Sequence, residues 1–200
     1  QLVDKLLEAP EADSKSTVKA DSNVVSIRTA IQSHPDVNMI AISVPGEFAA
    51  AEALKALKSN ANVFLFSDNV SIADEVQLKK YAWSKDLILM GPDCGTADIN
   101  EVPFGFVNRV RKGNIGIIGS SGTGIQEIMT QIHRLGGGIS HVIGTGSRDL
   151  SDAVAGLSTK SAIIALETDE STETIVLVSK PASRTVMDQT LDALARTGKK

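Results

Sequence analysis

The stretch Ile115–Leu135, IGIIGSSGTGIQEIMTQIHRL, carries the pattern that decides the fold class. Residues 115–118 form a short apolar run interrupted only by a glycine, which is typical of a buried strand. Residues 120–124 are serine, threonine and glycine only, which indicates a loop. Residues 125–135 space their apolar side chains at helical intervals. A buried strand that leads through a short loop into a helix is the building unit of an α/β fold with a parallel sheet.

The same unit recurs on both sides of that stretch. Apolar runs predict further strands at 37–44, 63–66, 87–90, 139–143 and 175–178, and helices are expected at 25–33, 47–57, 71–85, 162–166 and 182–196. Pro103, Gly105 and Gly113 interrupt the pattern, so residues 97–113 are interpreted as a connector. The sequence therefore predicts two parallel-sheet α/β units, at 24–112 and 113–200, preceded by a short helix and a polar linker over 1–23.

Composition and charge exclude several classes of protein. The chain has 200 residues, of which 42% are hydrophobic, so it can bury a core. The net charge of −4 is mixed along the chain, and a single Trp and a single Tyr offer no base-stacking platform, so no nucleic-acid partner is expected. No apolar run approaches the ~20 residues of a membrane span, and none resembles a secretion signal. One cysteine builds neither a disulfide framework nor a zinc site, and we expect a cytoplasmic protein.

Both ends of the sequence look internal to a longer protein. Gln1 lies within the pattern of a helix, and Lys200 stands where an α/β chain would next enter a strand. We therefore expect the N-terminal part of the first unit and the C-terminal part of the second to lie outside these 200 residues.

The loop Ser120–Gly124 is the strongest candidate for a binding site. In open parallel sheets, ligands bind at the carboxyl ends of the strands, where loops lead into helix N-termini. Glycines let a ligand approach the backbone, free N–H groups and the helix dipole favour an anion, and the hydroxyls of Ser120, Ser121 and Thr123 add donors. The loop matches neither the P-loop nor the dinucleotide fingerprint. The alternative interpretation is a tight turn with a serine cap.

Other polar residues follow the predicted strands and are expected to line the same crevice: Asn69, Cys94, Thr96 and Arg148. Cys94 is a nucleophile if neighbouring backbone dipoles activate its thiol, and otherwise a packing residue. Arg148 with Asp149 forms either a structural ion pair or a clamp for a substrate anion. No spacing of His, Cys and carboxylate residues predicts a metal site.

Six stretches occur together in one order: IAISVPGEFAA, VFLFSDNVSIADEVQLKKYA, LILMGPDCGTA, GNIGIIGSSGTGIQE, GGGISHVIGTGSRDLS and IVLVSKPAS. Over about residues 37–182, this set resembles the FdrA family, which is related to the α subunit of succinyl-CoA synthetase. The resemblance implies a Rossmann-like CoA-binding-type domain at 24–112, followed by a flavodoxin-like CoA-ligase domain at 113–200. In the synthetases, the loop that resembles Ser120–Gly124 opens a helix facing a phosphohistidine, and the loop that resembles GPDCG lies near the CoA thiol.

The sequence departs from the synthetases at three places. Lys180 stands where they carry an active-site glutamate, and Ser147 replaces a glycine of their GGRDLS-like segment. Their catalytic histidine would lie beyond Lys200, as their CoA glycine motif would lie before Gln1. This reversal of charge at Lys180 argues against phosphohistidine chemistry in this chain. Lys180 is itself a candidate catalytic residue.

These features give three hypotheses. The first is an FdrA-type enzyme that binds CoA or an acyl phosphate for acyl transfer, with ATP or ADP as the nucleotide and with partner subunits. The second is a carbamoyltransferase subunit that acts on oxamate and carbamoyl phosphate in allantoin breakdown, as the resemblance implies. The third is a non-catalytic binding or assembly subunit that keeps the fold and the anion pocket.

Overall fold

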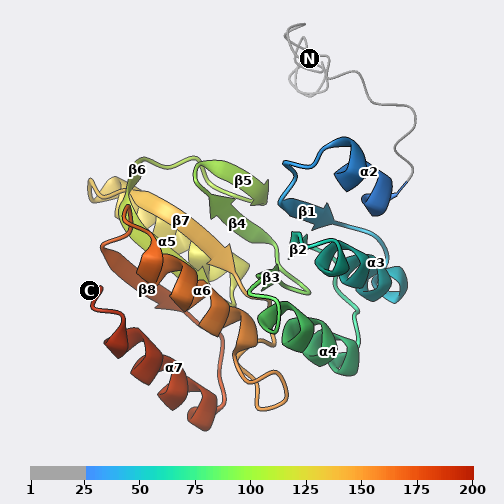
Figure 1. The fold of residues 1–200 in the computed structure, drawn as a ribbon. Coiled ribbons are helices and arrows are strands. Elements are labelled where there is room, and N and C mark those ends of the chain that lie inside the picture. The colour runs from blue at the N-terminus through green and yellow to red at the C-terminus, as the bar shows by residue number, and fades with distance from the viewer. Residues whose placement is uncertain (1–25) are drawn as a thin grey trace, which may run out of the picture.

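The computed structural model describes residues 26–200 (Figure 1), so the helix and linker predicted for 1–23 lie outside the described part. The elements, in chain order, are α2 (Ile27–Ser33), β1 (Met39–Ile42), α3 (Gly46–Lys58), β2 (Asn62–Leu65), α4 (Ile72–Trp83), β3 (Leu89–Met90), β4 (Thr96–Ile99), β5 (Val102–Gly105), β6 (Lys112–Gly119), α5 (Gly122–Arg134), β7 (Ile139–Gly144), α6 (Leu157–Thr168), β8 (Thr174–Val178) and α7 (Arg184–Arg196). The predicted α/β fold class is confirmed.

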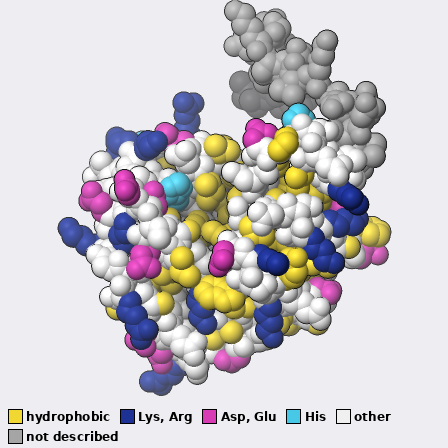
Figure 2. Space-filling view, in the orientation of Figure 1, with side chains coloured by type: hydrophobic (Ala, Val, Ile, Leu, Met, Phe, Trp, Pro, Cys, Tyr) yellow, Lys and Arg dark blue, Asp and Glu magenta, His cyan; other side chains and the backbone are white. Residues whose placement is uncertain are grey.

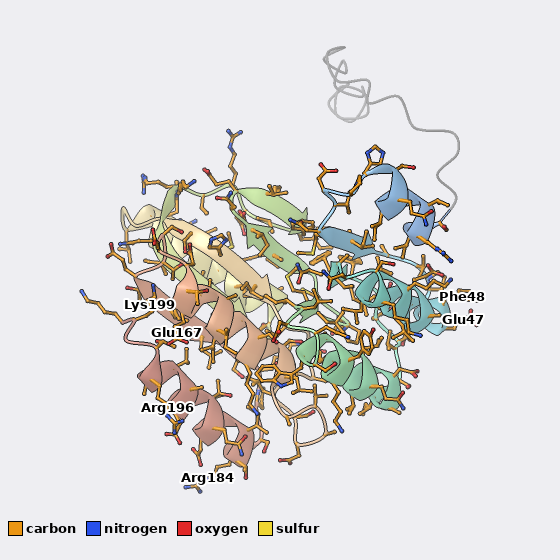
Figure 3. The ribbon with its side chains drawn as sticks, viewed as in Figure 1. Glu47, Phe48, Glu167, Arg184, Arg196 and Lys199 are labelled. Atoms are coloured by element: carbon orange, nitrogen blue, oxygen red, sulfur yellow. The ribbon has the colours of Figure 1, made fainter. Side chains whose placement is uncertain are left out.

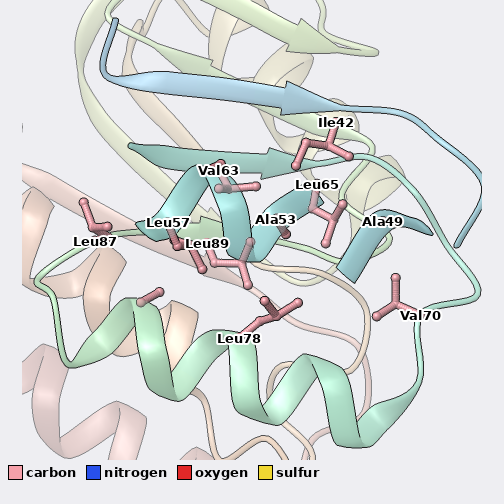
Figure 4. Close-up of a cluster of buried hydrophobic side chains, with 12 residues drawn as sticks. Ile42, Ala49, Ala53, Leu57, Val63, Leu65, Val70, Leu78, Leu87 and Leu89 are labelled. Atoms are coloured by element: carbon pink, nitrogen blue, oxygen red, sulfur yellow. The ribbon is translucent and has the colours of Figure 1, made fainter. Parts of the chain in front are cut away.

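The first unit is a three-stranded parallel sheet in the order β1-β2-β3. Helix α3 packs on it through the small side chains of Ala49, Ala53 and Ala56, which are fully buried and let the helix lie close to the strands. Helix α4 begins at Ser71, whose side chain accepts a hydrogen bond from the Asp74 N–H, as the sequence predicts. Figure 4 shows the apolar side chains of both helices meeting those of the strands.

The second unit is a five-stranded sheet in the order β5-β4-β7-β6-β8, in which β7, β6 and β8 are parallel. Helix α5 covers one face, where Ile125 and Met129 pack with Ile117 and Val142, and α6 and α7 cover the other (Figure 1). Lys199, after α7 (Figure 3), donates from Nζ to the carbonyl oxygens of Asp169 and Thr172, at 2.9 and 2.7 Å.

The structure corrects two predictions about secondary structure. The expected connector at 97–113 contains β4 and β5, which pair antiparallel with each other, and β4 also pairs with β7. Pro103 is tolerated because β5 is an edge strand, where a missing N–H breaks no necessary hydrogen bond. The short helix expected at 162–166 is the longer α6, because a carboxylate from the loop after β7 caps its polar first turn.

The two units share a continuous core. Phe64 and Met90 of the first sheet pack with Ala97, Ile118 and Ile143 of the second. A hollow of about 340 Å³ remains beside this core, lined by residues of both units, and Figure 2 shows hydrophobic side chains in it. Within residues 26–200, no helix is long and apolar enough to cross a membrane.

Candidate functional site

The loops at the carboxyl ends of the strands form one continuous crevice. Its inner end is a cavity of about 10 Å³ between the loops that follow β3, β6 and β7, lined by residues that include Thr96, Ser120, Gly122, Gly144 and Gly146. A groove of about 580 Å³ adjoins it and is lined by residues 43–45, 66–68 and Phe106. Asp93 and Gly95 belong to both, so the cavity is the inner end of the groove.

The start of α5 presents backbone donors to this inner end. Ser121 is the N-cap, and its Oγ accepts a hydrogen bond from the Gly124 N–H at 3.3 Å. The N–H groups of Gly122 and Thr123 make no hydrogen bond to any group within residues 26–200. Because the first N–H groups of a helix have no partner within the helix, they remain available to an anion. The Thr123 side chain is exposed and lines neither the cavity nor the groove.

Ser120 supports the pocket from below. Its side chain is buried, its N–H donates to the Val178 carbonyl at 2.9 Å, and its Oγ accepts from the Lys180 N–H at 3.0 Å. The hydroxyl thus fixes the end of β8 beside the start of α5. The side chain of Lys180 is exposed, so the structure brings this candidate to the crevice through its backbone.

Thr96 holds α5 in place from the opposite side. Its Oγ1 donates to the Phe106 carbonyl at 2.9 Å and accepts from Gln126 Nε2 at 3.1 Å. A Cβ at Gly122 would lie 3.2 Å from Thr96 Oγ1, so the helix approaches the Thr96 side chain closely at this position. Gln126 was missed by the sequence analysis, because its position on α5 gave no sign of which side chain it would meet across the crevice.

Cys94 lies beneath the cavity and is buried. Burial raises the pKa of its thiol to about 12. This increase outweighs the hydrogen bond with the Thr96 backbone and the charge of Lys79, which both lower the pKa. A thiol with this pKa is protonated at neutral pH and is a poor nucleophile. The structure therefore favours the packing interpretation of Cys94.

Alkylation tests this assignment. At pH 8, iodoacetamide is expected to leave Cys94 of the native protein unmodified for hours, because on the order of 10⁻⁴ of the thiol is ionised. Intact-mass spectrometry after addition of guanidinium chloride should then show one added group per chain. Rapid labelling of the native protein would instead indicate an activated cysteine.

Asn69 and Arg148 line neither the inner cavity nor the groove. Asn69 has a left-handed backbone with φ of 55°, is exposed, and donates from Nδ2 to Asp68 at 2.9 Å. The expected ion pair of Arg148 with Asp149 is wrong. Arg148 instead donates from Nε to Glu75 at 2.9 Å and from Nη2 to the Val70 carbonyl at 2.8 Å, because helix α4 passes beside the loop.

Asp149 pairs with Lys79 in the protein interior. Lys79 Nζ lies 2.7 Å from Asp149 Oδ1 and 3.0 Å from Glu75 Oε1, and it donates to the Thr145 carbonyl at 2.9 Å. Of the two contacts that Lys79 makes with carboxylates, only the one with Asp149 has the geometry of a hydrogen bond. Asp149 also accepts from the N–H groups of Ser158 and Thr159, at 3.1 and 2.9 Å, and so caps α6. Within residues 26–200, no group of three His, Cys, Asp or Glu side chains could hold a metal ion.

This geometry, with donors at a helix start beside an elongated groove, can be compared with known proteins. Residues 110–197 match the CoA binding domain. The CoA-binding match spans β6 to α7 and includes the start of α5. The chain is 51% identical over 172 residues to the uncharacterized protein YahF of Escherichia coli, a match that covers 86% of this chain and 33% of YahF. It is 28% identical over 148 residues to the succinate–CoA ligase [ADP-forming] α subunit of Methanothermobacter thermautotrophicus, covering 72% of this chain and 49% of that protein.

Solved structures share the fold. The dinucleotide forming acetyl-coenzyme A synthetase 1 of Ca. Korarchaeum cryptofilum superposes with a TM-score of 0.61 at 19% identity, over 80% of this chain and 36% of that one. The ATP citrate lyase of Methanothrix soehngenii, solved with citrate and coenzyme A, superposes with a TM-score of 0.60 at 16% identity, over 87% of this chain and 37% of that one.

The comparisons confirm the predicted relationship to the α subunit of succinyl-CoA synthetase. The narrower assignment to the FdrA family stays a prediction. The chain spans about a third of YahF and about half of the ligase α subunit, so the activity of a whole protein is a matter for proposal. The CoA-binding match falls on the second unit, and which unit corresponds to which ligase domain stays a prediction.

Proposed function

We propose that this chain is part of an acyl-CoA ligase-like enzyme that binds CoA and an acyl phosphate for acyl transfer. The observation that carries the proposal is the pair of open N–H groups at Gly122 and Thr123. They begin a 13-residue helix and belong to the segment that matches the CoA binding domain, and Gly122 lines the cavity at the inner end of the groove.

The start of α5 is proposed to hold the phosphate at the mouth of the inner cavity, which at about 10 Å³ has room for roughly one water molecule. The two N–H groups and the helix dipole favour an anion there, and the hydroxyls of Ser121 and Thr123 offer further donors. When a thiol sulfur attacks the acyl carbon, the bond from that carbon to the phosphate oxygen breaks and charge gathers on the phosphate. Donors already aimed at this position stabilise that charge without reorganising.

The adjoining groove is proposed to hold the CoA arm. Its volume of about 580 Å³ lies within the roughly 300–1,000 Å³ usual for ligand sites. Phe66 and Phe106 meet edge to face with their ring centroids 5.7 Å apart, and both line the groove. An arm lying along these rings would bring its thiol end to Gly95, beside the inner cavity.

A carbamoyltransferase is the second candidate. Lys180 places a positive side chain at the end of β8, where its N–H bonds to Ser120 at 3.0 Å. The exposed Lys180 ammonium lines neither the cavity nor the groove, so it is proposed to reach the phosphate of a carbamoyl phosphate from the solvent side, without a phosphohistidine. Carbamoyl phosphate is an acyl phosphate, so the two candidates share one site and differ in the acceptor.

We further propose that the chain acts in the cytoplasm with partner subunits and uses ATP or ADP. The support is that the succinate–CoA ligase relative is named as an α subunit and that an acetyl-coenzyme A synthetase of this fold was solved with phosphate and ADP. A non-catalytic binding subunit with the same pocket would bind the ligands and show no transfer when substrates are mixed.

Ligand titration of the Ser121→Asp variant tests the phosphate site. Aspartate keeps the N-cap but places a negative charge at the pocket, so affinity for inorganic phosphate and carbamoyl phosphate should fall by at least roughly tenfold. Isothermal titration calorimetry of the full chain with phosphate, carbamoyl phosphate, CoA and ATP measures this. Ser26→Asp, at the N-cap of the distant α2, is the matched control and should bind as the wild type does.

The outcomes separate the candidates. Equal phosphate affinity of Ser121→Asp and the wild type would refute the site at α5. Binding of CoA without either phosphate ligand would remove the carbamoyl candidate.

A further inference from the structure

We propose that Arg148 and Lys79 are positioning residues, which hold the wall of the anion pocket in place through the backbone and do not touch the ligand. The inference rests on the proposed function, because it concerns the same pocket. The wall in question is the loop 144–149, which contributes Gly144 and Gly146 to the inner cavity. Neither Arg148 nor Lys79 lines the cavity or the groove.

Arg148 joins the two parts of the crevice. It belongs to the loop that forms the wall of the pocket, and its Nη2 donates to the carbonyl of Val70 at 2.8 Å. Val70 follows the loop 67–69, of which Ser67 and Asp68 line the groove. One guanidinium therefore ties the groove side to the pocket side. Its Nε bond to Glu75, at 2.9 Å, anchors the same side chain to α4.

Lys79 fixes the same loop at both of its ends. Its ammonium donates to the Thr145 carbonyl at 2.9 Å and to Asp149 at 2.7 Å, so it contacts the loop at both ends. The side chains of Lys79, Glu75 and Asp149 are almost fully buried. A buried charge keeps its place only while its partners keep theirs, since any displacement leaves it uncompensated. The loop is thereby held to α4, an element of the other unit.

The loop has little room in which to shift. A Cβ at Gly144 would lie 2.4 Å from Cys94 Sγ and from the Thr96 carbonyl oxygen, and one at Gly146 would lie 2.3 Å from the Pro92 carbonyl oxygen. The wall is thus packed backbone against backbone on the loop after β3. Because the cavity measures only about 10 Å³, a small movement of the wall changes its shape substantially.

Lysine is not expected to replace Arg148. The guanidinium donates from two nitrogens in fixed directions, to a carboxylate on α4 and to a carbonyl at the groove, whereas an ammonium at the end of a flexible chain is a single point charge. Arg148→Lys should keep the attraction to Glu75 and lose the link to Val70.

The experiment compares Arg148→Met, Arg148→Lys and Leu57→Ala with the wild type in the full chain. Leu57 is buried at the far end of α3, so its truncation lowers stability without altering the crevice. Binding of inorganic phosphate and of CoA is measured by calorimetry well below the melting temperature of every variant. Arg148→Met should weaken phosphate binding by roughly 3- to 30-fold, the range seen for residues that contact neither ligand.

The conservative variant separates a positioning role from a purely structural one. Arg148→Lys should recover most of the lost melting temperature but little of the lost affinity, and Leu57→Ala should lose melting temperature but no affinity. Wild-type affinity in Arg148→Met, or an equal loss in Leu57→Ala, would overturn the inference and leave the proposed function standing. A wild-type chain that binds neither phosphate nor CoA would refute the proposed function and the inference with it.

Discussion

Replacing Lys79 by methionine is expected to lower the free energy of unfolding by about 3–5 kcal/mol. The side chain is 1% exposed, and its ammonium lies between Asp149, at 2.7 Å, and Glu75, at 3.0 Å. Methionine fills a similar volume but leaves the two carboxylates buried without their shared cation. The loss of one partner from a buried ionic group is far more damaging than the replacement of the whole group by apolar side chains.

Chemical denaturation measures this effect, and the sequence offers a matched control. Lys80 follows in the same helix and is exposed, so Lys80→Met should change the free energy of unfolding by less than about 0.5 kcal/mol. Urea titrations monitored through Trp83 fluorescence and through circular dichroism should coincide for both variants. Similar values for the two variants would mean that the buried cation contributes little to holding the units together.

Local sequence pattern predicted the parallel strands and their helices because each follows from hydrophobic spacing within a few residues. The elements that it missed depend on partners outside their own segment. Strands β4 and β5, of four residues each, pair with each other as a hairpin, and β4 also pairs with β7, some 40 positions later in the chain. Helix α6 begins in a polar stretch, Leu157 to Ser161, that is stabilised by Asp149 from the preceding loop.

The residues of the candidate site likewise fall into those that local sequence predicts and those that depend on a distant partner. The donors at the start of α5 were predictable, since a glycine and hydroxyl loop between a strand and a helix specifies its own local geometry. The roles of Thr96 and Arg148 were not, because each is set by a partner on another element, Gln126 and Glu75. No spacing in the sequence relates Lys79 to Asp149, which is 70 residues away. Side chains that hold a site from behind are therefore visible only in the folded chain.

Gly146→Ala is the second substitution expected to have a large effect, and Gly136→Ala isolates its cause. Both glycines have a left-handed backbone, with φ of 87° and 89°. A Cβ at Gly136 meets nothing within 4 Å, whereas one at Gly146 lies 2.3 Å from the Pro92 carbonyl oxygen and 2.9 Å from Gly91 Cα. Gly136→Ala should therefore cost only the backbone strain of about 1–2 kcal/mol. Gly146→Ala adds overpacking of about 1–3 kcal/mol against backbone atoms that have no rotamer to change.

The functional consequence should separate the two variants further. To accept the new methyl group, the loop at Gly146 must move away from the loop after β3, and both line the inner cavity beside the start of α5. Gly146→Ala should therefore weaken phosphate binding, while Gly136→Ala, at the opposite end of α5, should bind as the wild type does. Urea denaturation and phosphate titration of the same two samples measure both effects. Equal stability losses would show that the contact with Pro92 relaxes freely, and an unchanged phosphate affinity in Gly146→Ala would place the anion away from the mouth of this cavity.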